Sequence, residues 1–414
     1  MPSFSIQNFG CRVNQAEAFS WAEEFELGGM RLEEDPTRAD LVVVNTCALT
    51  AGAVRDVRKF IRRISRLNSG ARLIIAGCSV DGGTLRNEDL TPETLLLPNA
   101  DKTQLPARVL SRLETREAPV ARPLRSRAPL KVQDGCDLRC TFCIIPSVRG
   151  PSRSFGREEI RARARRLIAQ GFREIVLCGI HLSSYGLDRD PKDSLAGLLG
   201  DLANLEGLGR LRLSSLDPRY LDDVLSGLIT ESPRVCPHFH LSLQHASDRV
   251  LKLMGRRSNA AGYWRILERL RERSPEAALG ADIIVGFPGE EEQDFGRLRD
   301  FVAQSPLDYL HVFTYSPRPG TPAASWPQVE VREKRRRSAV LRTVAEDKRH
   351  AFRERFIGRE LRGIVVRKGA QGAEVLTSNY IDVLVPSCSG RPGDEVKVRI
   401  RRVESKLTGG EEAV

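Results

Sequence analysis

The sequence predicts an α/β protein made of an N-terminal doubly wound parallel α/β domain, a central partial (β/α)6 barrel and a small C-terminal β-barrel. In the first hundred residues, short apolar runs alternate with segments of helical periodicity. The same alternation is repeated about six times from Leu130 onward, and short stretches of alternating residues replace it after Gly358. Strand–helix alternation is typical of parallel sheets whose crossovers are right-handed.

Length and composition restrict the classes of protein that fit. The chain has 414 residues, a net charge of +11 and nine cysteines, and no window approaches the apolar length of a membrane span. The N-terminus lacks the basic and apolar regions of a signal peptide. Nine cysteines without an export signal indicate a reducing, cytoplasmic setting in which thiols serve metals. The positive charge favours a nucleic-acid partner and gives no support for a membrane.

Three cysteines follow the three predicted strands of the N-terminal domain, residues 1–102. The strands are expected at residues 5–9, 41–44 and 73–76, with helices at 16–27 and 54–67. Cys11, Cys47 and Cys78 each come directly after one of these strands. Because parallel strands end at one edge of a sheet, we expect the three thiols to converge there. The alternative is that each is an isolated buried cysteine.

The central barrel is predicted over residues 128–326, after a linker at 103–127 that is partly helical near 105–113. Its strands are expected at residues 130–133, 174–178, 210–214, 239–243, 281–285 and 309–314. Its helices are expected at residues 157–170, 194–205, 221–229, 248–254, 263–273 and 291–303. Polar residues follow the carboxyl ends of these strands, where such barrels carry their chemistry.

A loop after the first barrel strand holds three more cysteines, Cys136, Cys140 and Cys143, in C-x3-C-x2-C spacing. Three thiols this close are typical of a metal site. Structural zinc prefers four ligands, and no fourth cysteine or histidine lies nearby in the sequence. A [4Fe–4S] cluster held by three cysteines leaves one iron open for a further ligand.

This loop, continuing Ile-Ile-Pro-Ser-Val-Arg149-Gly150, resembles the cluster loop of radical S-adenosylmethionine (SAM) enzymes, and more narrowly that of the methylthiotransferases. The resemblance implies that Cys136, Cys140 and Cys143 are catalytic ligands of a [4Fe–4S] cluster whose open iron binds SAM. It also implies a SAM pocket, formed by the residues Phe142, Gly179, Ser215, Gln244, Val285 and Gly286. His181 and His245 are expected to be pocket wall or core, because hydrogen abstraction by a radical needs no general base. Cys178, Cys236 and Cys388 are expected to be inert buried thiols.

The segments around Cys11 and Cys47 are similar to the N-terminal domain of the methylthiotransferases. The resemblance implies that Cys11, Cys47 and Cys78 hold a second, auxiliary [4Fe–4S] cluster that carries or donates sulfur. It further implies an external electron donor and a sulfur source.

The chain from residue 327 to its end is basic. A helix rich in arginine is expected over residues 327–357, followed by a small barrel at 358–408 and a frayed tail at 409–414. Small five-stranded barrels bind oligonucleotides, and this one resembles the TRAM domain, an RNA-binding module. Arg399, Arg401 and Arg402 are expected to contact RNA phosphates.

Motifs near residues 10–15, 150–154, 180–186 and 213–218 look most like the MtaB type of the family. That type adds a methylthio group to C2 of N6-threonylcarbamoyladenosine at position 37, in the anticodon loop of tRNA. Arg149 and Arg153 are nominated as partners of the threonylcarbamoyl carboxylate, with packing or phosphate contact as their alternative role. The rival substrates are N6-isopentenyladenosine at the same position and an aspartate of ribosomal protein S12. An RNA-binding iron–sulfur protein without catalysis is the alternative of another class.

Overall fold

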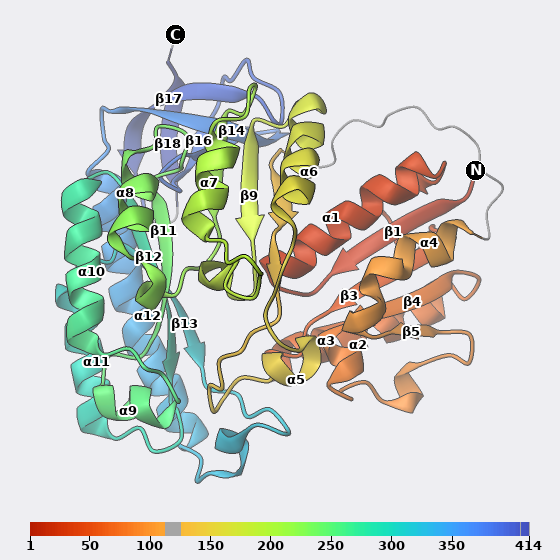
Figure 1. The fold of residues 1–414 in the computed structure, drawn as a ribbon, viewed down its shortest axis with the longest axis horizontal. Coiled ribbons are helices and arrows are strands. Elements are labelled where there is room, and N and C mark those ends of the chain that lie inside the picture. The colour runs from red at the N-terminus through yellow and green to blue at the C-terminus, as the bar shows by residue number, and fades with distance from the viewer. Residues whose placement is uncertain (112–125, 406, 414) are drawn as a thin grey trace. The chain divides into compact units, whose positions relative to one another are not determined.

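The structure, a computed structural model, describes residues 1–111, 126–405 and 407–413 (Figure 1). The chain divides into two compact units. Unit 1 contains residues 1–122, 134–153 and 316–324, and unit 2 contains residues 123–133, 154–315 and 325–414. This division does not follow chain order, so the domain boundaries drawn from the sequence stay predictions. Most of the linker expected at 103–127 lies outside the described residues, and only its start is seen, as α4 (Leu105–Leu110).

Unit 1 is built on a five-stranded parallel sheet with the strand order β2-β1-β3-β4-β5. The strands are β1 (Ser3–Asn8), β2 (Arg31–Leu32), β3 (Leu41–Thr46), β4 (Arg72–Gly77) and β5 (Leu95–Leu97). The helices of the unit are α1 (Arg12–Leu27), α2 (Ala51–Leu67), α3 (Cys78–Asp81), α4 and α5 (Ile145–Arg149). The predicted parallel sheet is confirmed, and the sequence missed only its two short outer strands.

Helices cover both faces of this sheet, as expected for a doubly wound fold. On one face, Trp21 and Phe25 of α1 pack with Val43 and Ile74 of the sheet. On the other face, α2 presents Val57, Ile61 and Ile64 at helical spacing to alternate residues of the same strands. The hydroxyl of Thr50 accepts the N–H of Ala53 (3.1 Å) and caps α2 at its N-terminus.

Unit 2 contains six parallel strands in the chain order predicted for a partial (β/α)6 barrel. They are β6 (Ala128–Lys131), β9 (Glu174–Cys178), β10 (Arg210–Leu213), β11 (His238–Gln244), β12 (Ala278–Val285) and β13 (Tyr309–Thr314). They form two three-stranded sheets, and an isolated bridge between Leu216, just after β10, and Leu241 of β11 connects these sheets. The helices are α6 (Arg157–Ala169), α7 (Leu195–Ala203), α8 (Asp223–Glu231), α9 (Asp248–Leu253), α10 (Ala260–Arg273) and α11 (Glu292–Gln304). Two short strands, β7 (Gln133–Asp134) and β8 (Arg153–Ser154), pair separately.

The long helix α12 (Val331–Glu354) precedes a closed barrel with the strand order β14-β15-β16-β18-β17. Its strands are β14 (Glu360–Gly369), β15 (Gly372–Thr377), β16 (Asp382–Val385), β17 (Glu395–Val403) and β18 (Thr408–Glu412). The frayed tail expected from residue 409 is wrong. Residues 408–412 pair antiparallel with β17 and touch β16, so this segment closes the barrel.

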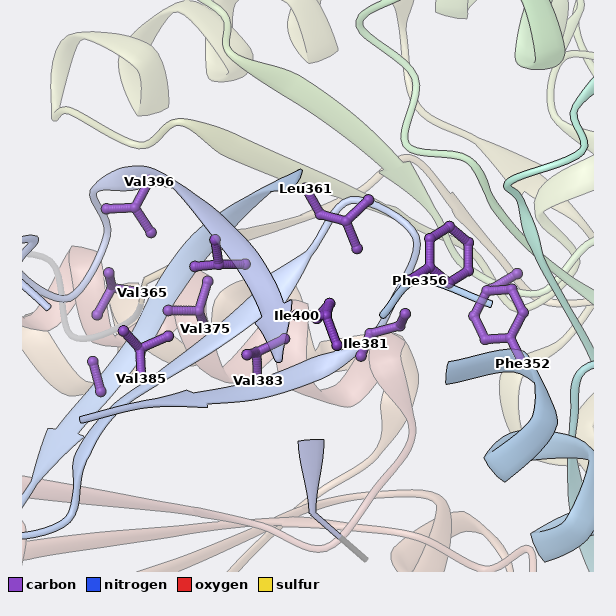
Figure 2. Close-up of a cluster of buried hydrophobic side chains, with 13 residues drawn as sticks. Phe352, Phe356, Leu361, Val365, Val375, Ile381, Val383, Val385, Val396 and Ile400 are labelled. Carbon is purple, nitrogen blue, oxygen red and sulfur yellow. The ribbon is translucent and has the colours of Figure 1, made fainter. Parts of the chain in front are cut away.

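The core of the small barrel extends to the end of α12 (Figure 2). Phe352 and Phe356 pack edge to face, with ring centroids 5.1 Å apart, and join Val383 and Ile400 in one buried cluster. The helix is therefore held to the barrel by apolar contacts.

A buried ion cluster joins the base of the parallel barrel to the small barrel. The carboxylate of Glu174, on β9, accepts Nε of Arg210 at 2.6 Å and Nε of Arg212 at 2.8 Å, both on β10. The other nitrogens of these guanidinium groups donate to the carbonyls of Leu376 (3.1 Å) and Thr377 (3.1 Å), at the end of β15. Burial opposes ionisation of Glu174, but the two arginines outweigh it and lower its pKa to about 2.

We predict that Glu174→Gln destabilises the protein at pH 7 by about 3–5 kcal/mol, because it leaves two buried guanidinium groups without their counter-charge. A depressed carboxyl pKa stabilises the fold above the unfolded value of 4.5, and this stability is lost as the pH falls toward about 2. The free energies of unfolding of parent and variant, measured in urea, should therefore converge as the pH falls through this range. Glu158→Gln, on the exposed surface of α6, is the control and should match the parent. A Glu174→Gln protein as stable as the parent at pH 7 would contradict the assignment.

Candidate functional site

Three thiols meet at the carboxyl edge of the sheet in unit 1. Cys11 is the N-cap residue of α1 after β1, Cys47 follows β3, and Cys78 begins α3 after β4. The strands β1, β3 and β4 are adjacent in the sheet. The structure therefore brings together three residues that lie 36 and 31 positions apart in the sequence, as 47 − 11 and 78 − 47.

The environment of Cys47 shows how close these thiols are. Burial, aided by the charges of Cys11 and Cys78, raises the pKa of the Cys47 thiol to about 12, although the N–H of Leu49 at 3.4 Å lowers it. Proximity of three thiols disfavours three thiolates unless a cation joins them. All nine cysteines lie in the described part of the chain, and none of them forms a disulfide.

The loop with Cys136, Cys140 and Cys143 belongs to the same unit as these three cysteines. Gly135 opens the loop at a φ of +70°, and a Cβ there would lie 1.9 Å from the carbonyl oxygen of Pro151, so only glycine fits. The N–H of Cys136 donates to Gly150 (3.1 Å), and the N–H of Cys143 donates to Cys140 (3.1 Å). The three thiols are half-buried on this turn.

A buried arginine follows the loop at the end of α5. The side chain of Arg149 is 1% exposed and contacts Glu17 (3.0 Å) and Asp134 (2.9 Å) through Nη1, and Asn14 (2.9 Å) through Nη2. Burial opposes the charge of Arg149. The negative charges of Glu17, Asp134, Cys78 and Cys11 outweigh that effect and hold its pKa well above the usual value.

A second buried cation completes this network. Nζ of Lys102 lies 2.6 Å from Oε2 of Glu17 and 2.9 Å from Oδ1 of Asn45. Burial lowers the pKa of Lys102, the charge of Glu17 opposes this, and Arg149 adds to the lowering. Two cations therefore balance two carboxylates, Glu17 and Asp134, beside the cysteine edge.

Sequence analysis missed this network, although one signal was present. Asn14 lies three residues after Cys11 and three before Glu17, so it is a neighbour of each of them on the surface of α1. Their partners Lys102 and Arg149 come from distant parts of the chain, so only the tertiary structure reveals the cluster.

The nomination of Arg149 as a carboxylate partner of the substrate is wrong on this geometry, since its guanidinium is buried and occupied by Glu17, Asp134 and Asn14. The alternative packing role fits it. Arg153, by contrast, is exposed. Its nomination stays a prediction.

In unit 2, the residues expected around SAM follow the carboxyl ends of neighbouring barrel strands. Gly179 follows β9, Ser215 follows β10, Gln244 ends β11, Val285 ends β12 and Gly286 follows it. Phe142 belongs to unit 1 with the cysteine loop.

Two of these positions have unusual backbones. Gln244 adopts a φ of +73°, which is costly for a residue with a side chain and is often found at functional sites. Gly286 adopts a φ of +70°, and a Cβ there would lie 2.4 Å from Cγ of Lys334. At the carboxyl ends of β11 and β12 the backbone therefore adopts positive φ angles, which most residues avoid.

The two histidines at this edge are buried, as predicted for pocket wall or core. Nδ1 of His245 accepts the N–H of Ser247 (2.9 Å), and burial lowers the pKa of His245 to about 3, so it is neutral at pH 7. His181 lies 3.5 Å from a carboxylate oxygen of Asp217 and packs edge to face on Tyr220. Cys178 and Cys236 are buried, and Cys388 is half-buried.

The three arginines expected to contact RNA lie on the surface of β17. Each forms an ion pair: Arg399 with Glu360, Arg401 with Glu411, and Arg402 with Glu404 at 3.5 Å. Exposed pairs of this kind are weak, so a phosphate could replace each glutamate at small cost.

Comparison with known proteins supports these assignments of fold and family. Residues 130–302 match the radical SAM superfamily, and residues 3–94 match the uncharacterized protein family UPF0004. The chain is 35% identical to the threonylcarbamoyladenosine tRNA methylthiotransferase MtaB of Aquifex aeolicus, an alignment that covers 92% of this chain and 95% of the relative. It is 34% identical to the MtaB of Thermotoga maritima, over 87% of this chain and 86% of that protein. The chain belongs to the MtaB-type methylthiotransferase family.

More distant similarity extends to solved structures. The methylthiotransferase chain shares its fold with the radical SAM methyltransferase TsrM of Kitasatospora setae, at a TM-score of 0.57 and 14% identity over 78% of this chain and 75% of that one. This match concerns the fold alone. The cofactors of this methylthiotransferase are SAM and two [4Fe–4S] clusters. Two sets of three cysteines, none of them in a disulfide, have the donor chemistry that such clusters require.

We predict that Arg149→Ala destabilises unit 1 by about 3–5 kcal/mol, because Glu17 and Asp134 then keep buried negative charges without their partner. The measurement is urea unfolding followed by tryptophan fluorescence, since Trp21 lies in the core of this unit. Arg153→Ala, four residues away and exposed, is the matched control and should change stability by less than about 0.5 kcal/mol. Equal stabilities for the two variants would show that the buried network contributes little.

Proposed function

We propose that the chain adds a methylthio group to C2 of N6-threonylcarbamoyladenosine at position 37 in the anticodon loop of tRNA, by a radical SAM reaction. The observation that carries this proposal is the second set of thiols at the carboxyl edge of the unit 1 sheet. A radical SAM enzyme needs one three-cysteine site to cleave SAM, and a further site accounts for the transfer of sulfur. The MtaB relatives, aligned over nearly the full chain, support the choice of substrate.

The two thiol sets are assigned to two clusters. Cys136, Cys140 and Cys143 would hold the cluster that binds SAM, and Cys11, Cys47 and Cys78 would hold the auxiliary cluster. When bound, the first cluster and SAM supply the 5′-deoxyadenosyl radical that a C–H bond without an acidic proton requires. Arg149 and Lys102 offset the negative charge that three thiolates bring to the auxiliary site.

The strand ends of unit 2 would bind and orient SAM. Ser215 and Gln244 offer polar side chains for hydrogen bonds, while Gly179 and Gly286 leave room for the side chains of Gln133 and Lys334 to pack against the backbone. His245 is neutral at pH 7 and takes up no proton there. These residues bind, orient and exclude water, and the cofactor performs the chemistry.

The tRNA partner fits the basic composition and the small barrel. No helix among the described residues is long and apolar enough to cross a membrane. We place the reaction in the cytoplasm, with an external electron donor and an external sulfur source.

A second candidate substrate, N6-isopentenyladenosine, is supported by a different relative. The chain is 32% identical to the tRNA-2-methylthio-N(6)-dimethylallyladenosine synthase of Zymomonas mobilis, over 96% of this chain and 94% of that protein. This relative acts on an apolar branched group, whereas a threonylcarbamoyl group ends in a carboxylate. A carboxylate requires a cation nearby, and Arg153 is the exposed candidate.

We predict that anaerobically reconstituted protein holds about eight irons, as two four-iron clusters. Replacing Cys136, Cys140 and Cys143 by Ala should remove about half of the iron and all cleavage of SAM. Replacing Cys11, Cys47 and Cys78 should remove the other half and leave SAM cleavage in place. Cys388→Ala, outside both sets, is the control and should keep all the iron. Full iron content in the second triple variant would refute the auxiliary cluster.

The purified enzyme should methylthiolate tRNA that carries threonylcarbamoyladenosine, and should leave tRNA that carries isopentenyladenosine unchanged. Nucleoside mass spectrometry of the reaction reads out both products. Arg153→Ala should lower turnover on the first tRNA beyond any loss of binding, while Arg165→Ala, on the exposed side of α6, should not. A methylthio-isopentenyl product, or a methylthiolated S12 peptide, would overturn the substrate but not the family.

Replacing Arg399, Arg401 and Arg402 together by Ala should weaken tRNA binding and flatten its dependence on salt. Loss of three phosphate contacts would reduce the slope of log K against log salt by roughly two to three. A charge-matched control replaces Arg163, Arg165 and Arg166 of α6. Cleavage of SAM without tRNA should not change in either variant. Identical slopes in parent and β17 variant would mean that these arginines only form surface ion pairs.

A further inference from the structure

Three potential metal ligands, none of them a cysteine, lie together on neighbouring barrel strands of unit 2. They are His240 on β11, Asp282 on β12 and His311 on β13, strands that run side by side in unit 2 (Figure 1). Asp282 and His311 are directly paired in the register of β12 and β13. Their neighbours on β12, Ala281 and Ile283, are fully buried on the opposite face of the strand. A rigid sheet therefore fixes all three side chains on one face.

The spacing of the ligand atoms suits a single ion. Nε2 of His240 lies 3.1 Å from Oδ2 of Asp282, and Nδ1 of His311 lies 3.4 Å from Oδ1 of the same carboxylate. One ligand atom from each residue lies within 4.8 Å of the other two. Because metal–nitrogen and metal–oxygen bonds to zinc are about 2.0–2.2 Å long, two of its ligand atoms stand about 3–3.5 Å apart.

A tyrosine orients the first of these ligands. The hydroxyl of Tyr309 lies 3.0 Å from Nδ1 of His240 and 2.7 Å from Nε2 of His238. Held through Nδ1, the His240 ring turns Nε2 toward Asp282. Histidine ligands of metals are usually fixed through their second nitrogen in this way.

The cluster is open on one side. The side chain of His311 is 52% exposed, and His311 and Tyr309 help to line a cavity of about 300 Å³. Arg342 and Arg349 of α12 line the same cavity. Glu346 and Asp382 line it as well, and Arg349 pairs with Asp382 at 3.4 Å. An ion bound by three protein ligands here would keep an open position toward this cavity.

We propose that His240, Asp282 and His311 form a site for a divalent transition-metal ion of the zinc class, distinct from the iron–sulfur clusters. Two imidazoles and one carboxylate match the ligands that Zn²⁺, Fe²⁺ or Co²⁺ accept, and the nitrogen ligands disfavour Mg²⁺ and Ca²⁺. The competing account is that both imidazoles donate hydrogen bonds to Asp282 and no ion binds. A measurement of metal binding distinguishes the ion site from the hydrogen-bonded cluster.

The test uses the reconstituted holoenzyme, in which the clusters occupy their thiol ligands. After a wash with EDTA, the protein is dialysed against Zn²⁺, and zinc and iron are measured together by mass spectrometry. The parent should bind one zinc per chain at unchanged iron content. Asp282→Asn and His311→Ala should abolish this binding, and Tyr309→Phe should weaken it about tenfold or more.

Two controls and a second readout secure the result. His350→Ala, a histidine on α12 beside Glu354, and Cys388→Ala should both bind zinc as the parent does. Zinc should also raise the Tm of the parent but not of His311→Ala, a half-exposed position whose replacement leaves the core intact. A parent that binds no stoichiometric zinc, an Asp282→Asn protein that binds it equally, or a loss of binding in Cys388→Ala would overturn the proposal.

Discussion

Parallel strand pairing is the constraint on which both candidate sites depend. In unit 1 it brings the ends of β1, β3 and β4 to one edge, and with them three cysteines from distant parts of the chain. In unit 2 the same rule collects Gly179, Gln244 and Gly286 at the carboxyl edge of the barrel strands. Since the backbone hydrogen bonds of a sheet fix its register, they also fix which residues reach these edges.

Buried charge is the second determinant of the structure. Glu17 joins two cations, Lys102 and Arg149, next to the cysteine edge, and Glu174 joins two arginines at the contact with the small barrel. Such clusters are stable only when every charge keeps its partner, because an isolated buried ion costs several kcal/mol. The first cluster links a helix, a sheet edge and the end of the cysteine loop within unit 1. The same charges therefore stabilise the fold of unit 1 and act on its thiols.

Sequence reasoning succeeded where a pattern is local. The strands at residues 174–178 and 309–314 were predicted with the bounds that the structure shows, because each is a short apolar or alternating run between helical segments. The convergence of the first three cysteines followed from topology. Strand β18 was missed because its sequence, Thr-Gly-Gly-Glu-Glu, has neither alternation nor β-branched residues beyond Thr408. It pairs because the barrel needs a fifth strand to close.

The buried charge network and the histidine–aspartate cluster could not be predicted, because they depend on contacts between residues that are distant in the sequence. Lys102 and Glu17 are 85 positions apart, and Arg149 and Glu17 are 132 apart, so no periodicity could connect them. For the same reason Arg149 was assigned to the substrate, when burial and two carboxylates give it a structural role. His240, Asp282 and His311 each look like an ordinary strand residue in the sequence, and only the register of three strands brings them together.

The most direct test of the account is nucleoside mass spectrometry of total tRNA from cells in which the gene is deleted. The account predicts that the methylthio form of threonylcarbamoyladenosine disappears while its unmodified parent accumulates. The intact gene should restore the modification, and a copy with Cys47→Ala should not. Persistence of the methylthio form in the deletion strain, or loss of methylthio-isopentenyladenosine in its place, would contradict the proposed function.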